Sequence, residues 1–99
     1  MKNPKFVIYK DKAAQFRFRL QAVNGQTILA SEGYSSKQGC TGGIASVKKN
    51  APDDNRYKRL ESSNGQFYFN LLAGNHEVIG TSEMYTTKAA RDNGINAVK

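Results

Sequence analysis

A chain of 99 residues has the length of one small domain, which excludes a second full-sized domain. Fifteen lysines and arginines against eight aspartates and glutamates give a formal net charge of +7, which favours association with polyanions. A single cysteine excludes an intramolecular disulfide, and one cysteine with one histidine provides too few ligands for a zinc site. We therefore expect a reducing, cytoplasmic location, no metal and no cofactor.

The first twelve residues, MKNPKFVIYKDK, carry a charge every few positions and hold no long apolar run. This pattern indicates neither a signal peptide nor a membrane span, so we expect no membrane partner. Within this stretch, KFVIYK at residues 5–10 is rich in β-branched and aromatic residues and predicts a strand. A second strand is predicted where Phe16, Phe18 and Leu20 alternate with polar residues, giving one dry face and one solvated face.

Asn24-Gly25 follows and favours a tight hairpin with positive φ angles, leading to a third strand, QTILAS, at residues 26–31. Cys40, Ile44 and Val47 then recur at spacings of four and three. This spacing predicts one apolar stripe of a helix over about residues 36–50.

The chain then repeats itself. Residues 15–48 align without a gap with residues 66–99, at an offset of 66 − 15 = 51. QFRFRLQAVN pairs with QFYFNLLAGN, SEGYSSK with SEMYTTK, and GIASVK with GINAVK. The segment NAPDDN between the copies has turn chemistry. We therefore expect a single domain, residues 1–99, made of two repeats at about residues 1–51 and 52–99.

The second repeat predicts the same elements: strands at RYKRLE, QFYFNLLA and EVIGTS, a turn at Gly74-Asn75, and a helix from about Thr87 to the end. A unit of about fifty residues buries too little apolar surface alone, so the two should share one core. We expect an α+β fold in which two tandem β-β-β-α repeats form one pseudo-symmetric, mainly antiparallel sheet with both helices packed on one face. The chain should be a monomer that acts as an intramolecular pseudo-dimer.

Four motifs occur in order and twice: an F-x-F-x-L strand, an N-G-type turn, an S-E-x-Y-[ST]-[ST]-K corner and a G-I-x-x-V-K helix. Over nearly the whole chain this resembles the YegP-like family of small bacterial proteins of unknown function. The resemblance implies tandem β3αβ units that share one sheet and exchange terminal strands, and it implies no activity. Family members usually continue into a final strand, so at Lys99 either a strand of the sheet is missing or the sheet does not need it.

The duplicated corner stands where a strand turns into a helix. There the hydroxyls of Ser36 and Thr87 can accept hydrogen bonds from free backbone amides of the first helical turn, which is N-capping. The alternative is an anion site, in which the same amides, with Lys37 or Lys88, hold a phosphate or carboxylate. We favour capping, because every helix needs it and few helices bind ligands there.

No catalytic residues are predicted, and we expect the protein not to be an enzyme. Cys40 lies on the apolar helix stripe and His76 in a turn, so a buried, inert thiol is favoured over a Cys-His nucleophile. Glu32 and Glu83 could form a pseudo-symmetric carboxylate pair, but pairing with nearby cations is favoured. Arg91 stands where the first repeat has Cys40, and the sequence gives no reason for it.

The solvated sheet face is the remaining candidate site. Its predicted nucleic-acid-binding residues are Arg17, Arg19, Tyr68, Asn70 and Lys58, with Tyr9 and Lys10 nearby. Cations and an aromatic on an open sheet suit single-stranded nucleic acid, since phosphates meet the cations and bases stack on rings. We therefore predict a non-enzymatic binding module with weak affinity for single-stranded nucleic acid or another polyanion. The alternative is a protein-interaction module that uses an exposed sheet edge.

Overall fold

The computed structural model describes residues 5–22 and 24–99, so the prediction that the N-terminus carries no leader rests partly on residues outside this range. The strands are β1 (Lys5–Lys10), β2 (Phe16–Gln21), β3 (Thr27–Ser31), β4 (Tyr57–Glu61), β5 (Phe67–Leu72) and β6 (Val78–Thr81). The helices are α1 (Lys37–Asn50), the short 3-10 helix η1 (Asp54–Arg56) and α2 (Lys88–Val98). The six strands form one antiparallel sheet in the order β1-β2-β3-β6-β5-β4. The predicted α+β fold of two tandem β-β-β-α repeats is confirmed.

The two repeats meet at the centre of the sheet, where β3 pairs with β6 through Ala30 opposite Thr81 and Ser31 opposite Gly80. The equivalent strands β1 and β4 form the two edges. After α1 the chain passes through η1 to β4, which pairs with β5 at the far edge of the sheet. The symmetry-related edge, beside β2 of the first repeat, is occupied by β1.

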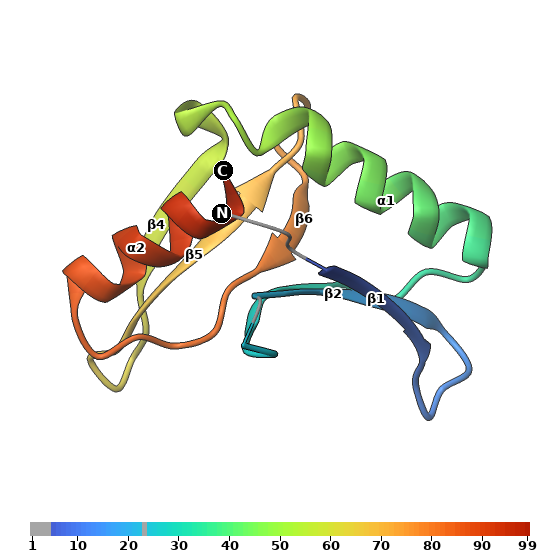
Figure 1. Ribbon diagram of the computed structural model, residues 1–99, viewed down its shortest axis with the longest axis horizontal. Coiled ribbons are helices and arrows are strands. Elements are labelled where there is room, and N and C mark those ends of the chain that lie inside the picture. Colours follow the sequence, from blue (N-terminus) through green and yellow to red (C-terminus); the bar gives the residue numbers. More distant parts are fainter. Residues whose placement is uncertain (1–4, 23) are drawn as a thin grey trace.

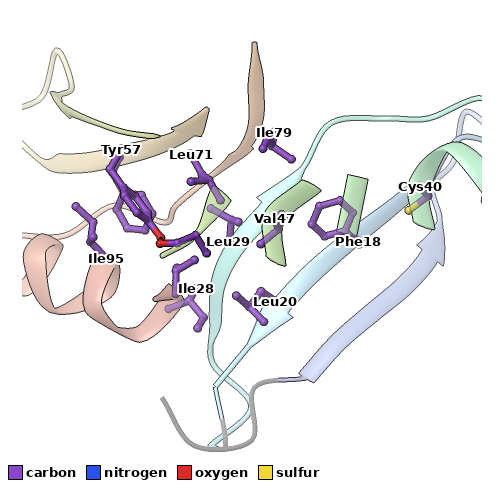
Figure 2. Close-up of a cluster of buried hydrophobic side chains, with 13 residues drawn as sticks. Phe18, Leu20, Ile28, Leu29, Cys40, Val47, Tyr57, Leu71, Ile79 and Ile95 are labelled. Carbon is purple, nitrogen blue, oxygen red and sulfur yellow. The ribbon is translucent and has the colours of Figure 1, made fainter. Parts of the chain in front are cut away.

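Both helices cover the same face of the sheet (Figure 1). Helix α1 packs on β2 of its own repeat and on β5 and β6 of the other, and α2 packs on β5 and on β3. Side chains of both repeats therefore belong to one core, as Figure 2 shows. Its buried members are Phe18, Leu20, Ile28, Leu29, Cys40, Val47, Ala51, Tyr57, Phe69, Leu71, Ile79, Ile95 and Val98.

The repeats differ where they touch. Leu29 is fully buried, and its counterpart at the offset of 51 is Gly80. A Cβ built on Gly80 would lie 2.7 Å from Leu29 Cγ, well inside van der Waals contact. The Leu29 side chain therefore occupies the space that a side chain at Gly80 would need. Two identical large residues would clash at this contact between the repeats, and two glycines would leave a void.

All four hairpins share one loop design, which differs from the predicted two-residue turn. Each loop has three residues, and the last adopts the left-handed conformation: Ala14 (φ 64°), Gly25 (φ 83°), Gly65 (φ 81°) and His76 (φ 69°). The predicted Asn24-Gly25 pair therefore has a positive φ only at Gly25, and the second turn has it at His76 rather than at Gly74-Asn75. This is the three-residue hairpin in which a left-handed residue precedes the returning strand.

Candidate nucleic-acid interface

The serine that opens each corner phrase has a structural role. Ser31 Oγ accepts a hydrogen bond from the Phe18 amide (2.9 Å) and donates to the Glu32 carbonyl (2.8 Å). Ser82 Oγ makes the same two bonds in the second repeat, with the Phe69 amide and the Glu83 carbonyl, both at 2.9 Å. Both serines are buried, so each hydroxyl satisfies backbone groups at the point where β3 or β6 ends.

The tyrosine of the phrase packs the corner against the helix. The ring of Tyr34 lies over Gly43 of α1, and a Cβ there would lie 2.8 Å from Tyr34 Cζ. Tyr85 lies in the same way over Gly94 of α2. Burial raises the pKa of both tyrosine hydroxyls, so they stay uncharged at neutral pH. The glycine of the G-I-x-x-V-K motif therefore makes room for the tyrosine ring.

The capping prediction is confirmed. Ser36 Oγ accepts from the amide of Gly39 at 3.0 Å, and Thr87 Oγ1 accepts from the amide of Ala90 at 3.1 Å. Lys88 Nζ lies 5.9 Å from the centre of the Phe67 ring, where it covers that half-buried side chain. Anion binding at these helix starts, with Lys37 or Lys88, stays a prediction.

Strand register decides which side chains face away from the helices. Residues that pair opposite one another share a face, and those that pair with the buried core positions lie on the helix side. The opposite side, here called the open face, carries Lys5, Val7, Tyr9, Arg17, Arg19, Gln21, Ala30, Lys58, Leu60, Tyr68, Asn70, Leu72 and Thr81. Four of these strand residues are cations and none is a carboxylate. Lys10 was predicted to lie nearby, but it pairs with Phe16 on the helix side.

The first half of the open face is built around two arginines. Arg17 Nε lies 2.6 Å from Asp11 Oδ2, and this hydrogen bond lowers the pKa of the Asp11 carboxyl. Arg17 is therefore largely neutralised by a loop residue that the sequence did not indicate. Arg19 is exposed, and its guanidinium carbon lies 4.4 Å from the centre of the Tyr9 ring. The pair forms a cation-π stack on β1 and β2.

The second half lies on β4 and β5. Lys58 pairs with Asn70, whose Oδ1 accepts a hydrogen bond from Thr81 Oγ1 at 2.9 Å, and Tyr68 pairs with Leu60. Strands β3 and β6 separate this half from the arginines, which at about 4.8 Å per strand spacing gives roughly 14 Å across the sheet. All five predicted residues thus share the open face, but they form two clusters.

The described part of the chain offers few residues for nucleophilic or metal chemistry. Cys40 is fully buried, and burial raises the pKa of its thiol, so it is not an activated nucleophile. Its counterpart Arg91 is also buried, with Nε 3.3 Å from Asp92 Oδ1 and the guanidinium 5.7 Å from the Phe67 ring centre. Within residues 5–22 and 24–99, no three potential metal ligands gather, and neither helix has the length and apolar character to cross a membrane.

Comparison with known proteins places the chain among relatives of the same architecture. The family model "Domain of unknown function (DUF1508)" matches twice, at residues 11–57 and 62–99, and the two starts differ by 62 − 11 = 51, the offset of the internal repeat. The chain is 63% identical over 94 residues to the UPF0339 protein in the ptx operon 5′ region of Stutzerimonas stutzeri, covering 95% of this chain and 85% of that protein. It is 52% identical to the UPF0339 protein YegP of Escherichia coli K12, covering 95% and 86%.

Solved structures of relatives have the same fold. The solution structure of Escherichia coli yegP, a protein of unknown function, superposes with a TM-score of 0.92 at 49% identity, covering 99% of this chain and 84% of that one. A UPF0339 protein from Shewanella oneidensis gives a TM-score of 0.90 at 47% identity, covering 96% and 80%. The chain therefore belongs to the YegP-like UPF0339 proteins, a family built from DUF1508 repeats for which no function is established.

Proposed function

We propose that this protein is a non-enzymatic binding module that takes single-stranded nucleic acid, or a polyanion of similar charge spacing, on the open face of its sheet. One observation carries the proposal. The strand residues of the open face include four cations and two tyrosines but no carboxylate. A surface of this composition attracts phosphates and offers rings for stacking.

The two clusters suit different parts of such a ligand. Arg19 and Lys58 are exposed and have no carboxylate within ion-pair distance in the described part of the chain, so both are able to meet phosphates. Tyr68 and the stack of Arg19 on Tyr9 offer flat surfaces for bases. The small side chains of Ala30 and Thr81 lie between the clusters, so a strand crossing the sheet meets no bulky obstacle.

The alternative, strand addition at a sheet edge, has weaker support. The edge strand β1 begins and ends with the exposed residues Lys5 and Lys10, and β4 carries Lys58 and Arg59. Charged side chains, lysine above all, are the usual protection of an edge against pairing with another chain. A partner protein that stays bound at high salt would nevertheless favour this alternative.

Fluorescence anisotropy with a labelled single-stranded oligonucleotide, at low and moderate salt, tests the proposal. The variant Arg19→Gln/Lys58→Gln should bind at least about tenfold more weakly and show a shallower salt dependence. The matched control is Lys48→Gln/Lys49→Gln, which removes two exposed charges from the last turn of α1 and leaves the open face intact. An equal loss in the control would mean that net charge alone governs binding, and absence of binding at low salt would refute the proposal.

A further inference from the structure

Arg17 is the one cation of the open face that has a carboxylate partner among the described residues. Its Nε lies 2.6 Å from Oδ2 of Asp11, which belongs to the loop between β1 and β2. The Asp11 side chain is only 20% exposed, so the pair lies against the sheet rather than free in solvent. Arg17 also donates to the Ser31 carbonyl at 3.4 Å, which fixes the guanidinium from a second side.

The second repeat shows that the loop itself does not need this carboxylate. At the offset of 51, Asp11 corresponds to Ser62 and Arg17 to a tyrosine. Asp11 Oδ1 accepts a hydrogen bond from the amide of Gln15 at 3.0 Å. Ser62 Oγ accepts the equivalent bond from the amide of Gln66 at 3.2 Å. One side-chain oxygen therefore closes the loop in both copies, and the second oxygen of Asp11 serves Arg17.

This ion pair changes what the open face offers to a phosphate. Arg17 pairs directly opposite Tyr9, whose ring is covered by Arg19. A phosphate beside that stack would meet two guanidinium groups if Arg17 were free. It meets one while Asp11 holds the other, because a carboxylate and a phosphate compete for the same donors.

We propose that Asp11 is a built-in competitor, which lowers the affinity of the open face for phosphate groups by keeping Arg17 paired. This inference rests on the proposed function and adds to it the residue that sets the affinity of the same site. Removing the carboxylate adds one phosphate contact. On a single strand, one further contact steepens the slope of log affinity against log salt by about 0.7. Since counterion release contributes little near 1 M salt, this slope amounts to about fivefold in affinity at about 0.1 M salt.

The test measures binding of the labelled single-stranded oligonucleotide by fluorescence anisotropy over a range of salt concentrations. Asp11→Asn removes the charge and keeps an oxygen for the loop amides, and Asp11→Ser copies the residue that closes the loop of the second repeat. Both variants should bind about fivefold more tightly than the parent at about 0.1 M salt, with a slope steeper by about 0.7. Adding Arg17→Gln to Asp11→Asn should return the affinity and the slope to the parent's values.

The matched control is Glu61→Gln, which raises the net charge by the same amount. Glu61 is exposed and pairs with Phe67 on the helix side of β4. Its removal should change the affinity by less than about twofold, because salt screens charges that lie far from the bound strand.

An unchanged affinity and slope in either Asp11 variant, while the parent binds, would overturn the inference and leave the proposed function standing. An equal gain in Glu61→Gln, or a gain that survives the loss of Arg17, would also overturn it. If the parent fails to bind at low salt and Asp11→Asn binds through Arg17, the proposed function fails for the parent protein and the competitor role holds. If none of the proteins binds, both fail.

Discussion

The contact between Leu29 and Gly80 gives the sharpest test of how the two repeats share one core. Gly80→Ala adds a single methyl group, whose carbon would lie 2.7 Å from Leu29 Cγ and 2.9 Å from Cδ2. Leu29 is fully buried and surrounded by side chains of both repeats, so it has little room to move (Figure 2). Overpacking of this kind costs about 1–3 kcal/mol of unfolding free energy.

A double-mutant cycle isolates the contact. Leu29→Ala alone should cost about 2–5 kcal/mol through lost burial and the cavity left behind. In the Leu29→Ala background the new methyl at Gly80 meets no Cγ, so the double variant should be more stable than additivity predicts by about 1–3 kcal/mol. Urea denaturation followed by circular dichroism measures all four free energies.

An internal control uses the same substitution elsewhere. Gly42 lies exposed in α1, and a Cβ built on it meets nothing within 4 Å, so Gly42→Ala should stabilise the protein by up to about 1 kcal/mol. Additive free energies in the cycle, or a Gly80→Ala variant as stable as the parent, would refute the account of an asymmetric junction.

Three further predictions concern the helix caps, the hairpin loops and Tyr57 at the start of β4. Ser36→Ala and Thr87→Ala should each cost about 1 kcal/mol in thermal melts, because each removes an observed cap; unchanged stability of both would contradict it. Ala14→Gly and His76→Gly should each raise the free energy of unfolding by about 0.5–1 kcal/mol by relieving left-handed backbone, whereas no gain in urea titrations would exclude strain there. Burial raises the pKa of Tyr57, so the unfolded chain loses this proton first and stability should fall as pH rises above about 10. Tyr57→Phe should make that alkaline decline shallower, and an unchanged pH profile would show that Tyr57 does not cause it.

The strands and helices could be predicted because the spacing of apolar residues changes in the same way in both repeats. It is two residues in the strands and three or four residues in the helix. Alternation at Phe16, Phe18 and Leu20 specifies one buried face, and the spacing of Cys40, Ile44 and Val47 specifies one helix stripe. The hairpin type could not be predicted, because Asn-Gly suits both two-residue and three-residue loops.

The arrangement of the candidate site residues could be predicted only in part. Alternation along β2 and β5 placed Arg17, Arg19, Tyr68 and Asn70 on one face, and the register confirms that placement. The ion pair that neutralises Arg17 depends on the β1–β2 loop, which brings Asp11 next to the strand. No local sequence pattern indicates this contact. Likewise, the separation of the clusters follows from the strand order, with both central strands between them.

The internal repeat also indicates where binding is to be sought. In both copies the first hydroxyl of the corner phrase and the capping hydroxyl bond to backbone groups of their own repeat, so folding alone accounts for these two positions. The copies differ instead on the open face, where Arg17 and Arg19 of the first repeat correspond to Tyr68 and Asn70 of the second. A duplicated fold needs identical corners but places no such demand on solvated positions. The solvated positions at which the symmetry is broken, rather than the corners at which it is kept, are therefore where a ligand would be selected.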